Sequence, residues 1–243
     1  MKRNFSNRLS PMRAAQLFVS EHFSECDGAL LAGSVVRGEA TETSDLDLVI
    51  FEKSIPSSYR ESFVMYNWPI EIFVHNLTSY QTFFKADYDQ ATPSMQRMVS
   101  EGLVIKDTGI ITSIKKEANE QLMKGPEPWS DENIRVKRYF ITDTLDDFIG
   151  SVDKEEDICC ANTLFELVAD FVLRTNRQWT GKSKWLIRSL KKFDADFTQL
   201  YVEAFNQFYK NEDKTHVIQL VDDVLKPHGG RFFHGFSLGK KDD

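Results

Sequence analysis

The sequence predicts an α+β protein in which a mixed β-sheet flanked by helices is followed by an all-α helical bundle. Segments with helix and strand periodicity alternate up to the stretch Gly125-Pro126-Glu127-Pro128, and strand patterns fade beyond it. Of the 243 residues, 41% are hydrophobic and 19 are Phe, which is enough apolar material for two modest domains. We therefore expect a sheet domain over residues 1–126 and a helical domain over residues 127–243.

The N-terminal half is expected to open with a helix and then to form the sheet. Apolar residues at helical spacing predict an amphipathic helix over residues 11–23. An apolar strand over 29–32 ends at Gly33-Ser34, and the turn there is expected to open a short helix. The other expected elements are strands at 45–51, 59–66, 70–75 and 103–106, with helices near 79–85 and 94–100.

The C-terminal half is expected to contain helices joined by short loops. Ser130 is suited to cap the first of them, because its hydroxyl can accept a hydrogen bond from a backbone N–H of the first turn. Helices are expected over residues 134–149, 158–175, 184–191, 197–208 and 216–225.

Charge and cysteine content disfavour several classes of partner. The formal net charge is −7, so the chain as a whole repels nucleic acid and anionic membrane surfaces. The three cysteines do not resemble a disulfide framework or a zinc site, which favours a reducing cytoplasm. We find no signal-peptide pattern and no stretch approaching the ~20 apolar residues of a membrane span, so we expect a cytoplasmic protein without a membrane partner.

The first candidate for chemistry is the turn after the strand at 29–32. Gly33 allows a phosphate to approach the backbone closely, and the free N–H groups of a following helix would favour an anion. The Ser34 hydroxyl can add one more donor. These residues predict a phosphate-binding turn.

The second candidate is a set of three carboxylates. Asp45 and Asp47 lie two residues apart on an expected strand, so their side chains point to the same face and repel each other. Glu71 lies in the strand at 70–75 with apolar residues on both sides, where a charge without a partner would destabilise the fold. A divalent cation that prefers oxygen ligands, such as Mg²⁺, would resolve the repulsion if the strands are neighbours.

These segments resemble the DNA polymerase β-like nucleotidyltransferase superfamily. Gly33-Ser34, the spacer and Ser44-Asp45-Leu46-Asp47-Leu48 are similar to its signature, over roughly residues 29–75. Within it the chain looks most like the bacterial branch that modifies antibiotics such as aminoglycosides and lincosamides. A second match is Trp179-Thr180-Gly181-Lys182-Ser183-Lys184-Trp185, similar to a segment in the helical domain of related bacterial proteins.

The resemblance implies a metal-dependent nucleotidyltransferase that moves a nucleoside monophosphate from a nucleoside triphosphate, ATP above all, onto a hydroxyl of a small acceptor. Asp45, Asp47 and Glu71 would bind two Mg²⁺ ions, with Mn²⁺ able to substitute, and would be the catalytic residues. The residues implied to contact the nucleotide are Gly33, Ser34, Arg37, Ser44, Lys182 and Lys184. The third acid of the family is often Asp, so the register of Glu71 is less fixed than that of the aspartate pair.

Several alternatives stay open. Lys182 and Lys184 also suit plain surface lysines, and Arg37 and Ser44 suit loop support. A carboxylate outside the triad could deprotonate the acceptor, and the candidates are Asp146, Asp147, Glu166 and Asp170. A protein or RNA acceptor, a nucleotide sensor without catalysis and a toxin–antitoxin module are rival functions, and a homodimer is compatible with the sequence.

Overall fold

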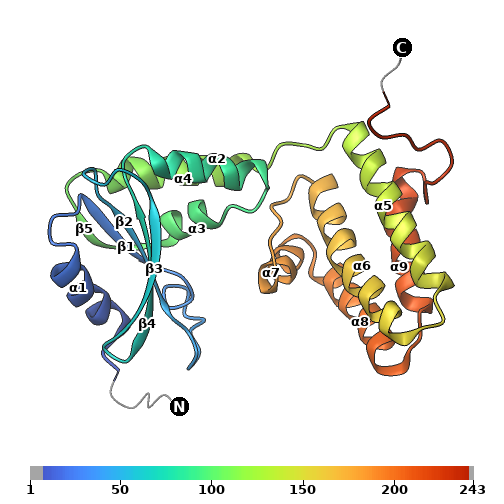
Figure 1. Ribbon diagram of the computed structural model, residues 1–243, viewed down its shortest axis with the longest axis horizontal. Coiled ribbons are helices and arrows are strands. Elements are labelled where there is room, and N and C mark those ends of the chain that lie inside the picture. The colour runs from blue at the N-terminus through green and yellow to red at the C-terminus, as the bar shows by residue number, and fades with distance from the viewer. Residues whose placement is uncertain (1–7, 241–243) are drawn as a thin grey trace. The chain divides into compact units, whose positions relative to one another are not determined.

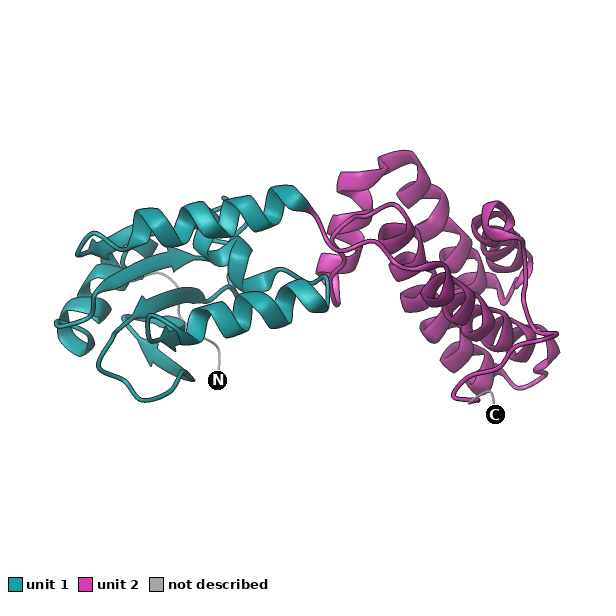
Figure 2. Ribbon diagram, turned by 90° about the horizontal axis from the view of Figure 1, so that it is seen from above, with its two compact units in different colours: residues 1–124 teal, residues 125–243 magenta. Residues whose placement is uncertain are grey.

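The computed structural model describes residues 8–240 and divides the chain into two compact units, residues 1–124 and 125–243 (Figure 2). The first unit contains a five-stranded sheet in the order β3-β4-β2-β1-β5 (Figure 1). Its strands are β1 (Gly28–Ala32), β2 (Leu46–Phe51), β3 (Tyr59–Met65), β4 (Trp68–His75) and β5 (Leu103–Asp107). β2 and β4 are parallel and the other neighbouring strands are antiparallel, so the sheet is mixed.

Helices cover both faces of this sheet. The helices of the unit are α1 (Pro11–His22), α2 (Ser79–Asp89), α3 (Ser94–Glu101) and α4 (Ile111–Lys124). One core joins α1 to alternate residues of β2 and β4, among them Leu48 and Ile72. The other core joins α2, α3 and α4 to Val49 and Phe51 on the opposite face (Figure 1). Strand alternation thus supplies two apolar layers from one set of strands.

The α+β class with a mixed sheet and a helical second half is confirmed, but one local expectation was wrong and one helix was missed. Residues 34–38 form turns rather than a short helix after Gly33. The helix α4 was not expected at all. Its start is fixed by the carboxylate of Asp107, which accepts hydrogen bonds from the backbone N–H groups of residues 109, 110 and 111. Ser130 directly precedes its helix, whereas Asp107 is the last residue of β5 and lies four residues before α4, so its capping role depends on the turn between them.

The second unit is helical in all its regular structure within the described residues. Its elements are α5 (Asp131–Gly150), α6 (Lys154–Thr175), α7 (Lys184–Phe193), α8 (Ala195–Asn211), α9 (Thr215–Leu225) and the short 3₁₀ helix η1 (Lys226–His228). Ser130 caps α5 as expected, accepting from the N–H of Asn133. The core is centred on α6 and is rich in aromatic rings, including Phe148, Phe171 and Tyr201.

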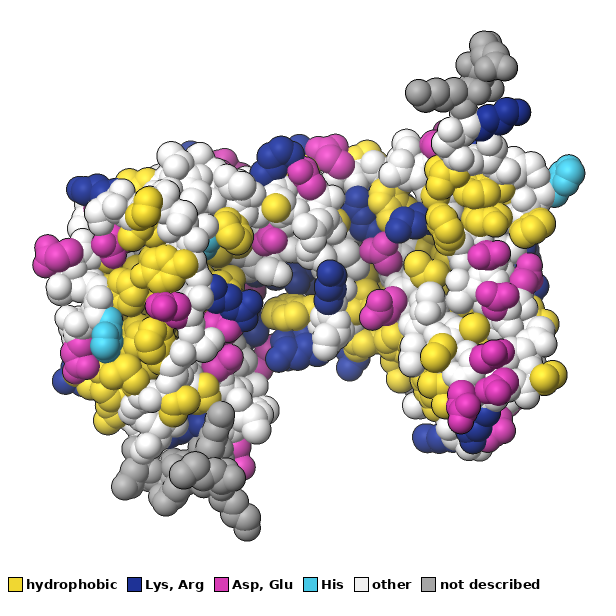
Figure 3. Space-filling view, viewed as in Figure 1, with side chains coloured by type: hydrophobic (Ala, Val, Ile, Leu, Met, Phe, Trp, Pro, Cys, Tyr) yellow, Lys and Arg dark blue, Asp and Glu magenta, His cyan; other side chains and the backbone are white. Residues whose placement is uncertain are grey.

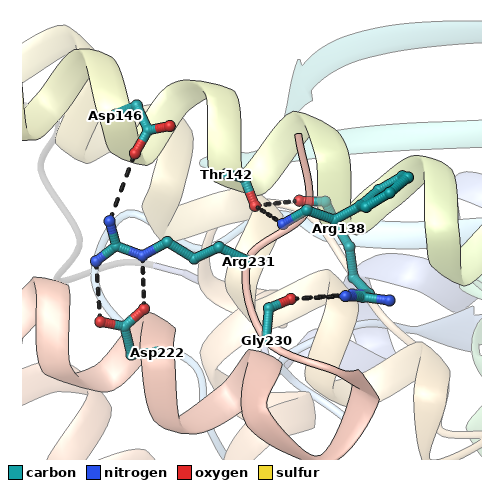
Figure 4. Close-up of polar contacts among 7 residues, drawn as sticks. Arg138, Thr142, Asp146, Asp222, Gly230 and Arg231 are labelled. Carbon is teal, nitrogen blue, oxygen red and sulfur yellow. Dashed lines mark hydrogen bonds and ion pairs between the residues drawn. The ribbon is translucent and has the colours of Figure 1, made fainter. Parts of the chain in front are cut away.

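The segment after η1 is held against α5 and α9 (Figure 4). The guanidinium of Arg231 makes two hydrogen bonds to Asp222, at 2.7 and 2.9 Å, and a longer one to Asp146 at 3.4 Å. Arg138 donates to the carbonyl of Gly230 at 2.8 Å. The hydroxyl of Thr142 accepts from the backbone N–H of Phe232 at 2.9 Å. Arginine contacts with two hydrogen bonds to one partner fix orientation, so residues 230–232 are attached firmly to α5 and α9.

No helix within residues 8–240 combines the length and apolar content needed to cross a bilayer. On the face shown in Figure 3, acidic and basic side chains are interspersed on both units.

A buried histidine lies at the end of β4, away from the start of β2. His75 is 3% exposed, its ring contacts Phe83 at a centroid distance of 4.8 Å, and its Nδ1 has no hydrogen-bond partner. Burial disfavours the charged ring and lowers the pKa of His75 from 6.5 to about 4.

Acid should therefore destabilise the fold partly through His75. Between pH 6.5 and about pH 4 the unfolded chain binds a proton that the folded protein does not. The His75 contribution to the free energy of unfolding is complete above pH 6.5 and should fall by about 1.4 kcal/mol per pH unit below it. Urea titrations of wild type and His75→Phe measure the difference. The exposed His234→Phe is the control, and identical pH profiles for wild type and His75→Phe would contradict the prediction.

Candidate active site

Three carboxylates meet where β2 begins. Asp47 is the second residue of β2, and Asp45 precedes the strand by one residue. The parallel pairing of β2 with β4 places Glu71 directly beside Asp47 in register. One carboxylate oxygen from each of the three lies within 4.8 Å of the others, and all three side chains are half-buried.

Burial and repulsion within this group both raise the pKa of Asp47. Partial burial raises the pKa of Asp47 to about 6, and the negative charges of Asp45 and Glu71 add to the rise. Arg37 and Arg60 oppose the shift but do not cancel it. The site therefore holds more negative charge than its own cations balance, which a bound cation would correct.

The carboxylate of Asp47 leaves no room for a side chain at position 33. A Cβ atom placed on Gly33 would lie 1.9 Å from Oδ2 of Asp47, and the backbone there has φ +79°. Any side chain would therefore collide with Asp47 and strain the backbone. The glycine predicted for phosphate approach thus also makes room for a member of the acidic group.

The loop between β1 and β2 is held together by Ser44. Its hydroxyl accepts from the backbone N–H of Thr41 at 2.8 Å and from the hydroxyl of Ser34 at 3.2 Å. The N–H of Glu39 donates to the carbonyl of Ser34. Ser34 and Ser44, both expected near phosphate, thus lie together in one tight loop beside the carboxylates.

Arg37 connects this loop to α3. Its guanidinium donates to Glu39 at 3.1 Å and to Glu101 at 3.0 Å, and the side chain is 20% exposed. These two acids raise the pKa of Arg37 although burial opposes them. The structure thus places Arg37 near the site but bound to protein carboxylates.

Two residues of β3 that were not expected from the sequence contact Glu71. Arg60 forms an ion pair with Oε2 of Glu71 at 2.6 Å, and Ser62 donates to Oε1 at 3.3 Å. Both lie on the same face of β3, two residues apart. The alternation was available in the sequence, but the register of β3 against β4 was not.

Lys182 and Lys184 belong to the second unit and are exposed at the start of α7. Their segment is tightly built. A Cβ on Gly181 would lie 2.7 Å from Cβ of Trp185, and Ser183 has φ +52°, a rare conformation for a residue with a side chain. The backbone of this segment is therefore packed closely against the first turn of α7, while both lysine side chains are exposed.

The candidate base residues are also in the second unit. Asp146 is paired with Arg231, while Asp147 and Glu166 are exposed. Asp170 differs from them because it is half-buried and desolvation raises its pKa, although Lys137 and a hydrogen bond with Thr180 oppose the rise.

Comparison with known proteins is consistent with this geometry. Residues 15–81 match the nucleotidyltransferase domain family. The matched segment contains Gly33, Ser34, Arg37, Ser44, Asp45, Asp47 and Glu71. The match lies within the first unit and gives no support for an antibiotic-modifying branch.

A crystal structure of a nucleotidyltransferase-like protein from Exiguobacterium sibiricum 255-15 is similar to the chain, with 12% identity and a TM-score of 0.47. The similarity covers 89% of this chain and 74% of that one. No curated protein matches the sequence.

The acidic group fits a divalent cation of the magnesium type. Two oxygen ligands on opposite sides of one Mg²⁺ ion are roughly 4.2 Å apart. One carboxylate oxygen from each of the three acids lies within 4.8 Å of the others, so a small inward movement of the side chains would let them share one ion. Oxygen donors alone, without nitrogen or sulfur, favour Mg²⁺ or Mn²⁺ over Zn²⁺.

Removing one charge from the group should stabilise the metal-free protein. The folded pKa of Asp47 is raised from 3.8 to about 6, so the ionised side chain costs stability above pH 6 and none below pH 3.8. We expect Asp47→Asn to raise the free energy of unfolding by on the order of 2 kcal/mol at pH 8 in EDTA. The gain should disappear near pH 4.

Denaturant titrations with and without divalent cation check this. Mn²⁺ should raise the free energy of unfolding of wild type by more than that of Asp47→Asn, so the advantage that the variant has in EDTA should shrink as Mn²⁺ is added. The control is Asp89→Asn, which removes an exposed carboxylate that forms an ion pair with Lys85. A loss of stability in EDTA for Asp47→Asn would contradict the repulsion.

Proposed function

We propose that the protein is a nucleotidyltransferase that moves a nucleoside monophosphate from a nucleoside triphosphate, ATP above all, to a hydroxyl of a small molecule and releases pyrophosphate. The observation that supports this most strongly is the convergence of Asp45, Asp47 and Glu71 beside the Gly33–Ser44 loop. A paired-carboxylate strand beside a glycine turn suits phosphoryl chemistry, where catalysis consists mostly of positioning and charge stabilisation.

In this proposal Asp45, Asp47 and Glu71 hold two Mg²⁺ ions, with Mn²⁺ able to replace them. When bound, such ions neutralise phosphate charge and lower the pKa of an attacking hydroxyl. The N–H groups and hydroxyls of Gly33, Ser34 and Ser44 orient the phosphates, so that the acceptor oxygen faces the α-phosphorus in line with the leaving group. Arg37 acts by fixing the loop to α3 through Glu39 and Glu101.

We further propose that residues 1–126 form the catalytic domain and residues 127–243 support the nucleotide and the acceptor. Lys182 and Lys184 would add positive charge for the triphosphate, and one of Asp146, Asp147, Glu166 and Asp170 would serve as base for the acceptor. An aminoglycoside-like antibiotic is the acceptor class that the sequence resemblance favours. Three free thiols and a nucleotide substrate suit the cytoplasm.

The metal assignment predicts that Asp47→Asn abolishes transfer. The variant keeps the shape of the side chain but loses a charged ligand, so Mg²⁺-dependent pyrophosphate release should fall at least about a thousandfold. Far-UV circular dichroism should show an unchanged fold. Asp89→Asn should match wild type, and full activity in Asp47→Asn would refute the assignment.

The acceptor and the nucleotide can be found in two steps. A thermal-shift series with ATP, GTP, CTP and UTP, each with and without Mg²⁺, identifies the nucleotide. Labelled nucleotide and a panel of hydroxylated antibiotics, peptides and RNA then identify the acceptor by mass shift. Stabilisation by nucleotide without transfer to any of them would favour a nucleotide sensor.

Lys182 and Lys184 are predicted to contribute charge to nucleotide binding. Lys182→Ala and Lys184→Ala should each raise the KM for the nucleotide by about fivefold to tenfold, because each removes one phosphate-directed cation. Steady-state kinetics measure the change. Lys192→Ala, an exposed lysine at the other end of α7, is the matched control. An unchanged KM in both variants would mean that these lysines are ordinary surface residues.

A further inference from the structure

Arg60 lies on the edge strand of the sheet and reaches the acidic group from outside it. β3 pairs only with β4 in the strand order, so its other edge has no neighbouring strand in the described sheet. Its side chain is 62% exposed, whereas that of its partner Glu71 is 18% exposed. The guanidinium also lies over the ring of Phe73, 4.9 Å from its centroid. Arg60 is thus an accessible cation joined to a half-buried carboxylate.

The ion pair between Arg60 and Glu71 uses an oxygen of a proposed metal ligand. Arg60 contacts Oε2 at 2.6 Å and Ser62 donates to Oε1 at 3.3 Å, so both oxygens of Glu71 have protein partners. A cation bound by Glu71 would compete with these contacts for the same negative charge. Water screens the charge of Arg60, whose side chain is 62% exposed, so the pair contributes on the order of 1 kcal/mol and can be exchanged at low cost.

Arg37 provides a useful contrast. It is 20% exposed and lies between two carboxylates, Glu39 and Glu101. Exchange there would leave two acids without their arginine contacts. Arg60 pairs with Glu71, and most of its side chain is exposed to solvent. Its planar guanidinium can bind phosphate oxygens in the same two-pronged way that it binds a carboxylate.

We propose that Arg60 is an exchangeable counter-ion of the site, paired with Glu71 when the metal is absent and with phosphate oxygens of the nucleotide when metal and nucleotide are bound. The inference rests on the proposed function. Binding of the cation by Glu71 reduces the attraction that Glu71 exerts on Arg60. The triphosphate brings new negative charge to the same face of the sheet, so the guanidinium moves from the carboxylate to the phosphate.

Exchange predicts opposite effects on the two ligands. In Arg60→Gln the cation that competes for Glu71 is gone, so Mn²⁺ alone should bind about threefold tighter. The same variant lacks a phosphate contact, so the complex of Mg²⁺ with the nucleotide chosen by thermal shift should bind about tenfold more weakly. The KM should rise with kcat changed by less than about twofold, because the contact is made in both ground and transition states.

Mn²⁺ titrations followed by electron paramagnetic resonance measure the first effect without any catalysis. Calorimetry with a non-cleavable analogue of the nucleotide measures the second. Arg60→Lys keeps the charge but not the fork, so it should bind Mn²⁺ as wild type does and bind nucleotide with intermediate affinity. Lys53→Gln removes another exposed cation of the first unit, paired with Asp27, and should change neither affinity.

The outcomes separate this inference from the proposed function. Wild type must bind Mn²⁺, and Asp47→Asn must lose that binding, or the metal site itself is wrong. If both hold, weaker binding of both ligands by Arg60→Gln would mean that Arg60 only orients Glu71 and would overturn the exchange. Unchanged affinities in Arg60→Gln would overturn it as well, because the ion pair would then be an ordinary surface contact.

Discussion

The parallel pairing of β2 with β4 is the constraint on which the site depends. It places Glu71 beside Asp47 in register, although the two are separated by a loop and the whole of β3. A shift of one residue in this register would turn the side chain of Glu71 to the opposite face of the sheet, where α1 packs. The apolar neighbours Ile70 and Ile72 are buried on that face and prevent such a shift. The apolar core therefore holds the three carboxylates together, although their mutual repulsion opposes this arrangement.

The loop after β1 depends on the same carboxylates. Asp47 occupies the space that a side chain at position 33 would need, and Ser44, directly before Asp45, closes the loop through Ser34 and Thr41. Because the turn and the strand are built against each other, a phosphate held by the loop and a cation held by the acids would be neighbours. Without a helix at this turn, any anion binding has to come from individual N–H groups and hydroxyls rather than from a helix dipole.

Local pattern was sufficient for some of these features and not for others. Asp45 and Asp47 could be predicted to share a face because strand periodicity relates residues two apart, and the change from strands to helices is a matter of composition. Glu71 could be suspected from its apolar neighbours, but its partner strand depends on the tertiary order of the sheet. Arg60 and Ser62 could not be found, because their contacts depend on the register of a hairpin. The helix α4 was missed because its start depends on a side-chain cap at Asp107.

Charge balance explains why an edge strand is a suitable place for an arginine of this site. A cation buried among Asp45, Asp47 and Glu71 would neutralise the group permanently and compete with any metal at all times. A cation on an exposed edge gains little from its ion pair, because water screens it. It therefore stabilises the metal-free site only modestly, and a divalent cation can displace it. Arg60 is exposed in this way, since its side chain is 62% exposed and its guanidinium lies over the ring of Phe73. Arg37 is not, because its side chain is only 20% exposed. The exposure of the arginine, rather than its distance from Glu71, therefore decides whether it can change partners.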